Sequence, residues 1–69
     1  MTAAQYDALE RAIVDRSRVA IRVNGAEMVV IPDAIRVQGG RELLATQNPS
    51  SGLPMLLRID DIERLEVVR

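Results

Sequence analysis

The chain has 69 residues and a net charge of −1, so we expect one small domain with no overall field to attract nucleic acid or an acidic membrane. Histidine and cysteine are absent, which excludes disulfides, thiolate metal sites and the Ser–His or Cys–His pairs of nucleophilic catalysis. The sequence therefore predicts a non-enzymatic domain without a metal or cofactor. Its longest apolar run, residues 28–31, is far too short to span a membrane, and we expect a cytoplasmic protein.

The first predicted element is a helix over about residues 3–16. Thr2 and Gln5 stand three residues apart, the spacing of a capping box at a helix start. One apolar stripe recurs at helical spacing after them. It comprises Tyr6, Leu9, Ala12 and Ile13.

Two strands, at about residues 18–23 and 26–31, are predicted to form a hairpin around Asn24-Gly25. Both turn residues tolerate a positive φ, which a tight two-residue turn requires. This turn sets the register, and apolar residues then face apolar ones while Arg22 faces Glu27. The other expected pairs are Val23 with Ala26, Ile21 with Met28, and Val19 with Val30.

Pro32 is expected to end the second strand, because proline cannot donate a hydrogen bond to a sheet ladder. The alternation of apolar and polar residues then predicts separate strands at about residues 34–38 and 41–46.

The turn between these two strands contains Gln38-Gly39-Gly40. A three-residue turn sets Arg36 opposite Glu42 and Ile35 opposite Leu43, so charge meets opposite charge. A two-residue turn does not pair Arg36 with Glu42, so the cross-strand pairs match less well in charge. The sequence favours the three-residue turn.

Residues 47–54 are rich in Pro, Ser, Asn and Gly and predict a loop. A strand at about residues 55–59 follows, and Asp60-Asp61 interrupts it. Ile62 is expected to return to the core before a last strand at about residues 64–68. One helix before about five strands in a single domain, residues 1–69, is the order of an Sm/SH3-like small five-stranded β-barrel.

Arginine supplies every basic residue, and its planar guanidinium suits bidentate binding of phosphate. Convergence of the strand arginines would create a groove for RNA, single-stranded DNA or a nucleotide-like ligand. The alternative is a solvated face that Glu27 and Glu42 balance. The candidates are Arg18, Arg22, Arg36, Arg41 and Arg58.

Two further features leave alternatives open. Asp60, Asp61 and Glu63 are either a cation or docking site, or carboxylates that cap a turn. Val29 and Ile31 lie on the second face of an apolar strand. They are either covered by the helix or exposed for a second subunit, which would make the protein a homo-oligomer.

Four segments follow one another in an order seen in a known family. They are Leu9-x-x-Ala12-Ile13-x-x-Arg16-x-x-Val19-x-Ile21, Pro32, Gly40-Arg41-Glu42-Leu43-Leu44-Ala45 and Leu57-Arg58-Ile59-Asp60-x-Ile62. With them the sequence resembles the WYL domain, an Sm/SH3-like module of bacterial transcription regulators. The similarity implies a module that binds a nucleotide or nucleic-acid ligand through basic residues such as Arg58. Arg41-Glu42-Leu43 stands where that family carries Trp-Tyr-Leu, and Asp61 where a second basic residue is usual.

A second resemblance rests on Tyr6-Asp7-x-Leu9-Glu10-x-Ala12 and Leu57-Arg58-Ile59-Asp60-x-Ile62. These segments are similar to the Rho-binding antiterminator family, Rof, which is also an Sm-like barrel with a leading helix. The similarity implies that an acidic helix binds the termination factor Rho, with Tyr6, Asp7 and Glu10 at the contact. Both resemblances imply a role in transcription or RNA metabolism. A purely structural oligomerisation module is the third possibility.

Overall fold

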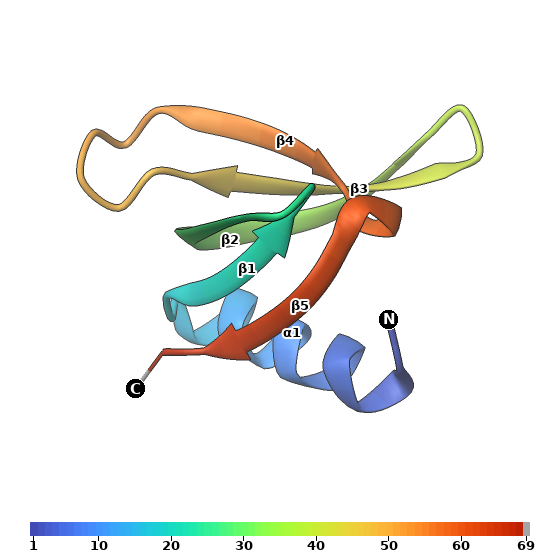
Figure 1. Ribbon diagram of the computed structural model, residues 1–69, viewed down its shortest axis with the longest axis horizontal. Helices are drawn as coiled ribbons and strands as arrows, with labels where there is room; N and C mark the ends of the chain where they lie inside the picture. Colours follow the sequence, from blue (N-terminus) through green and yellow to red (C-terminus); the bar gives the residue numbers. More distant parts are fainter. Residues whose placement is uncertain (69) are drawn as a thin grey trace.

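The computed structural model describes residues 1–68, and Arg69, the last residue of the expected domain, lies outside the described residues. One helix precedes five strands, and a single turn of 3-10 helix separates the last two (Figure 1). The elements are α1 (Ala3–Asp15), β1 (Val19–Val23), β2 (Ala26–Gln38), β3 (Arg41–Gln47), β4 (Pro54–Arg58), η1 (Ile59–Asp61) and β5 (Ile62–Val67).

Helix α1 begins with the expected capping box. The Gln5 amide donates to the Thr2 hydroxyl at 3.2 Å, and the Thr2 amide donates to Gln5 Oε1 at 2.8 Å, so two free N–H groups of the first turn are bonded. The helix ends where Arg16 takes a left-handed conformation, with φ of 54°. The predicted bounds of residues 3–16 are therefore confirmed to within one residue.

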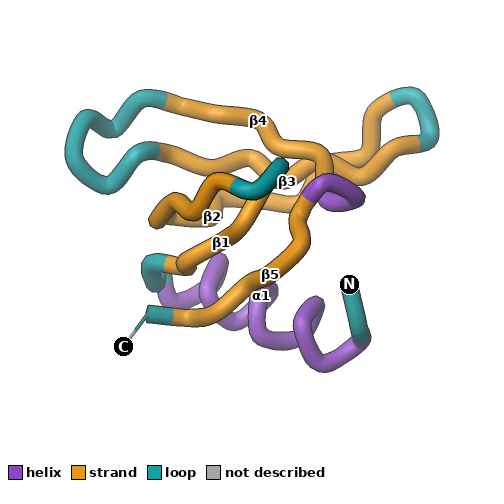
Figure 2. The backbone as a smooth tube through the Cα atoms, viewed as in Figure 1, coloured by secondary structure: helices purple, strands orange, loops and turns teal. Residues whose placement is uncertain are grey.

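The strands form one antiparallel sheet in the order β4-β3-β2-β1-β5. Because η1 has only three residues, the end of β4 and the start of β5 must lie close together, and the sheet is strongly curled (Figure 2). The expected closed barrel is not observed, since β4 pairs only with β3 and β5 only with β1 among the described residues. The fold is a mainly β domain with one N-terminal helix and an open five-stranded sheet.

The hairpin of β1 and β2 has the register expected from its turn, including Arg22 opposite Glu27 and Ile21 opposite Met28. Asn24 and Gly25 both have positive φ, 51° and 79°, as this tight turn requires. Glu63 supports the turn from β5, because its Oε1 accepts a hydrogen bond of 2.8 Å from the Gly25 amide.

Pro32 does not end the second strand. The predicted strands at residues 26–31 and 34–38 are one element, β2, in which residues 26–30 pair with β1 and residues 31–38 pair with β3. The register shifts between Pro32 and Ala34, so Asp33 is the extra residue of a bulge. A bulge tolerates the missing N–H of proline, and burial of Pro32 keeps the strand against the core.

The turn between β2 and β3 has two residues, not the three that the sequence favoured. Gly39 and Gly40 have φ of 58° and 76°, and Arg36 is opposite Leu43 while Val37 is opposite Glu42. A three-residue turn would have turned Leu44 away from the core. Leu44 is instead fully buried, and its burial outweighs the gain from one exposed Arg–Glu pair.

One aliphatic core lies between the curled sheet and α1. The helix packs against β2 and β5 and contributes Leu9 and Ala12 to the buried cluster. Ile59 is buried in η1 and Ile62 returns to the core at the start of β5, so the closing turn at Asp60-Asp61 is confirmed. The described residues include no helix of the length and apolarity that crossing a membrane requires.

Candidate anion-binding face

The outer side of the sheet, away from the core, brings together three of the five candidate arginines. Arg36 on β2 is paired with Leu43 on β3, and Leu43 is paired with Arg58 on β4. Paired residues of antiparallel strands point to the same side of a sheet, so the two arginines lie on either side of Leu43. Arg41 stands two residues before Leu43 on β3 and shares its side. We call this surface, with Arg36, Arg41 and Arg58, the arginine face.

The strand register spaces the three arginines so that their flexible side chains can contact one charged chain. Arg36 and Arg58 are two strand spacings apart, roughly 10 Å between their Cα atoms, and Arg41 is about 7 Å along β3 from Leu43. Each arginine is exposed. Flexible side chains on this spacing can reach neighbouring phosphates.

Strand alternation gives the arginine face a set of residues without a carboxylate: Ile31, Ala34, Arg36, Gln38, Arg41, Leu43, Ala45, Gln47, Pro54, Leu56 and Arg58. The bulge of β2 adds one carboxylate at Gln47, because Asp33 Oδ1 accepts a hydrogen bond of 3.2 Å from Gln47 Nε2 and lies 3.7 Å from Arg16 Nη1. Arg58 has one acidic neighbour in η1, where its Nε lies 3.9 Å from Asp61 Oδ2 and both side chains are well exposed. Arg36 and Arg41 have no ion pair within residues 1–68.

Glu42 lies on the opposite side of the sheet, contrary to the expectation that it balances Arg36. The two-residue turn moves the pairing by one position, and such a shift exchanges the two sides of a strand. On the core side, Glu42 Oε1 accepts a hydrogen bond of 2.7 Å from the Tyr6 hydroxyl. This bond, with burial and the negative charges of Glu42 and Asp60, raises the pKa of Tyr6 above 10.0.

Arg22 and Arg18 do not join the arginine face. Arg22 lies on β1, where Glu27 and Arg64 are its cross-strand neighbours. Arg64 in turn donates a hydrogen bond of 2.9 Å to Glu66, which raises the pKa of the Arg64 guanidinium. The outer side of this half of the sheet is thus charge-balanced. Arg18 precedes β1, and its carbonyl accepts a hydrogen bond from the Val68 amide.

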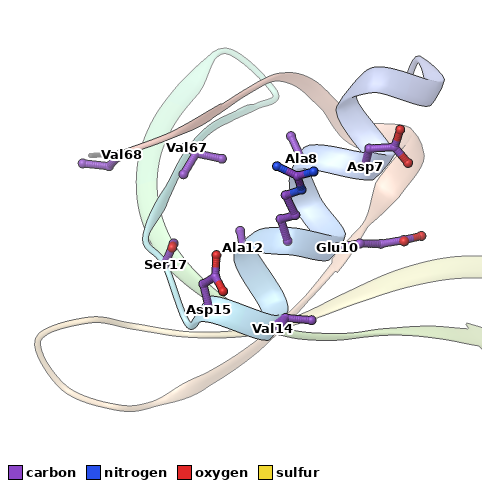
Figure 3. A pocket seen from close by; sticks show the side chains of 10 residues that line it. Asp7, Ala8, Glu10, Ala12, Val14, Asp15, Ser17, Val67 and Val68 are labelled. Atoms are coloured by element: carbon purple, nitrogen blue, oxygen red, sulfur yellow. The ribbon is translucent and has the colours of Figure 1, made fainter.

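The three helix candidates are divided between two sides of α1. Tyr6 is half-buried against the core and bonded to Glu42. Asp7 and Glu10 are exposed and project from the side of α1 away from Val67 and Val68 (Figure 3). They line an open pocket formed by α1 and the end of β5, together with Ala8, Arg11, Ala12, Val14, Asp15, Ser17, Val67 and Val68.

The acidic residues of the closing turn do not converge on one point. Asp61 lies beside Arg58, whereas Glu63 binds the Gly25 amide in the first hairpin turn. Within the part of the chain that the structure describes, no group of acidic residues is placed to hold a metal ion. Glu63 has a turn-supporting role.

The apolar residues beside the arginines were not identified from the sequence. Ala34, Ala45 and Leu56 are paired across β2, β3 and β4, and the Leu56 side chain is 55% exposed. The alternation of residues within each strand indicates that they share one side of the sheet. The predicted three-residue turn hides this, because it shifts β3 by one position relative to β2. On β2, Val29 is 44% exposed, so the helix does not cover it.

Comparisons of this chain with protein-family models, with curated proteins and with solved structures found no match.

Proposed function

We propose that this chain is a non-enzymatic binding module of the Sm/SH3-like type, acting in transcription or RNA metabolism. Its ligand is a nucleic acid or nucleotide-like molecule whose phosphates contact the arginine face, as the resemblance to the WYL domain implies. The observation that carries the proposal is the segregation of charge. A chain of net charge −1 presents Arg36, Arg41 and Arg58 together on one sheet surface. The carboxylate that β2 brings to this surface, Asp33, is bonded to Gln47, four residues along β3 from Leu43.

Segregated charge matters because phosphate binding depends on local charge more than on net charge. Carboxylates on the same surface would compete with phosphate for the guanidinium groups. The comparison with β1 and β5 illustrates this, since Glu27 and Glu66 accompany Arg22 and Arg64 there. The two halves of one sheet thus differ in charge although their arginine content is similar.

Fluorescence anisotropy with short RNA and single-stranded DNA at low and high salt tests the proposal. We expect binding at low salt and weaker binding at high salt, because bound phosphates release counterions. Arg58→Ala should weaken binding about tenfold, the equivalent of one charge-assisted hydrogen bond. Arg22→Ala is the matched control and should leave the affinity unchanged. Absence of binding at low salt, or equal effects of the two variants, contradicts the proposal.

A protein-binding module is the second candidate, because Asp7 and Glu10 are exposed beside each other on α1. The resemblance to the Rof family implies that these carboxylates contact the transcription termination factor Rho. We leave Tyr6 out of the proposed contact, because its hydroxyl is bonded to Glu42. A pull-down with Rho decides this candidate. Capture that Asp7→Arg abolishes supports it, and failure of the unmodified protein to capture Rho rejects it.

A structural homo-oligomer is the third candidate. Strands β4 and β5 are the two edges of the open sheet, and unpaired edges can add a further strand. Light scattering over a range of protein concentrations measures the mass directly. A monomer at all concentrations rejects this candidate and leaves the arginine-face proposal unaffected.

A further inference from the structure

The arginine face consists of two parallel rows that run across the strands. The first row is Arg36, Leu43 and Arg58, and the second is Ala34, Ala45 and Leu56. The rows are two residues apart along each strand, about 7 Å. A charged row thus lies directly beside an apolar one.

The apolar row is accessible. Leu56 lies on the edge strand β4 and is 55% exposed, while Ala34 and Ala45 are half-buried. The two alanines have no side chain beyond Cβ, so no bulky group covers the sheet surface beside Leu56. A flat group can contact the Leu56 methyl groups and the alanine Cβ atoms at once.

We propose that the ligand of this site is a single-stranded nucleic acid lying across β2, β3 and β4, with its phosphates on Arg36, Arg58 and the neighbouring Arg41 and its bases on the apolar row. This inference rests on the proposed function and adds the class of ligand and its direction. The separation of the rows is similar to the distance between a phosphate and its base. The row is roughly 10 Å long, so it accommodates a short stretch of single strand whose bases lie flat on the sheet and are not stacked on one another.

Charge and apolar area together select the single strand. In a duplex the base faces are stacked inside, so the apolar row would have no base to contact. Inorganic polyphosphate has no base and would use the arginines alone, whereas a free nucleotide could place one base on the apolar row but would occupy only part of both rows. The apolar row offers no hydrogen-bonding side chain, and contact with a base face is independent of base identity, so binding is insensitive to sequence.

Leu56→Ser tests the apolar row, because the residue is exposed and its replacement spares the core. The probes are an unstructured oligonucleotide of about 12 thymidines, an RNA of equal length, a DNA duplex and inorganic polyphosphate. We expect Leu56→Ser to weaken binding of both single strands about fivefold. Binding of polyphosphate and the dependence of single-strand affinity on salt should not change.

Val29→Ser is the matched control, since Val29 is a 44% exposed aliphatic residue on the outer side of the other half of the sheet. It should not alter single-strand affinity. The inference is overturned if Leu56→Ser leaves that affinity unchanged, if it weakens polyphosphate binding equally, or if the duplex binds as tightly as the single strand. The proposed function fails separately, when Arg58→Ala has no effect on any of the probes.

Discussion

The Tyr6 hydroxyl donates a hydrogen bond of 2.7 Å to Glu42 Oε1, which joins α1 to β3 over 36 positions of sequence. The bond occupies the carboxylate on the core side of the sheet. The arginine face, on the other side of the same strand, is therefore left without a counter-charge from β3. Helix docking and the charge of the binding surface depend on one two-residue turn, because the turn sets which side Glu42 occupies.

The ionisation of Tyr6 reports this bond. The chain has one tyrosine and no lysine or cysteine, so Tyr6 is the only side chain that titrates near pH 10. Its pKa is raised above 10.0 in the folded state, which means that folding favours the protonated phenol. The stabilisation is complete below about pH 10 and is lost as the pH rises through the folded-state pKa. Absorbance titration of the tyrosine, with urea unfolding at about pH 9 and pH 11, measures both effects.

Glu42→Gln is the control for the Tyr6 titration. It removes the negative charge and keeps an oxygen that accepts the hydrogen bond, so the pKa of Tyr6 should move towards 10.0. Tyr6→Phe should lose about 1 kcal/mol or less at neutral pH and should unfold without the extra loss of stability above pH 10. A Tyr6 pKa that Glu42→Gln does not change contradicts the assignment.

Leucines on the two sides of the sheet should differ strongly in their contribution to stability. Leu44 is fully buried on the core side, while Leu56 is 55% exposed on the arginine face. Leu44→Ala should lower the free energy of unfolding by about 2–5 kcal/mol, since it removes buried methyl groups and leaves a cavity. Leu56→Ala should cost less than about 1 kcal/mol. Urea unfolding monitored by circular dichroism compares them, and equal losses would mean that the register of β3 is wrong.

A carboxylate should weaken ligand binding only when it is placed on the arginine face. Gln38 and Val37 are adjacent on β2, but Gln38 is opposite Arg41 on the outer side and Val37 is opposite Glu42 on the core side. Gln38→Glu places a negative charge beside Arg41, and its repulsion of a bound phosphate about 7 Å away costs about 0.6 kcal/mol of binding free energy, or roughly threefold in affinity. Val37→Glu gives the same net charge and should leave the affinity of single-stranded DNA almost unchanged.

Fluorescence anisotropy at low salt measures both variants, and circular dichroism checks that each is folded. Val37→Glu faces the Glu42 carboxylate and should cost some stability for that reason. The comparison is therefore made well below its unfolding temperature. If the two variants weaken binding equally, net charge rather than the arginine face controls the interaction.

Local signals in the sequence predicted α1, the first hairpin and the closing turn correctly. Each depends on neighbours within a few positions: the Thr2–Gln5 capping box, the Asn24-Gly25 turn, and the Asp60-Asp61 break before Ile62. Short-range geometry fixes such elements, because turn conformation and side-chain alternation leave one consistent register. All three are present in the structure.

The errors came from effects that act over longer distances. An apparent charge pair, Arg36 with Glu42, suggested a three-residue turn, but burial of Leu44 beside Ile35 and Leu57 decides the register. Proline at position 32 predicts a strand end, but a bulge at the point where β2 changes partners accommodates Pro32 within the strand. The same turn error concealed the separation of Glu42 from the arginines. The structure brings three of the five candidate arginines to one side of the sheet and places Glu42 on the other side.

The slope of log affinity against log salt concentration tests the central claim most directly. Three phosphate contacts to a single strand predict a slope of about −2 for the unmodified protein. The triple variant Arg36→Ala, Arg41→Ala and Arg58→Ala should show a slope near zero and little binding, whereas Arg22→Ala should keep the slope of about −2. A triple variant that retains the unmodified slope would contradict the assignment of the arginine face as the phosphate-binding surface.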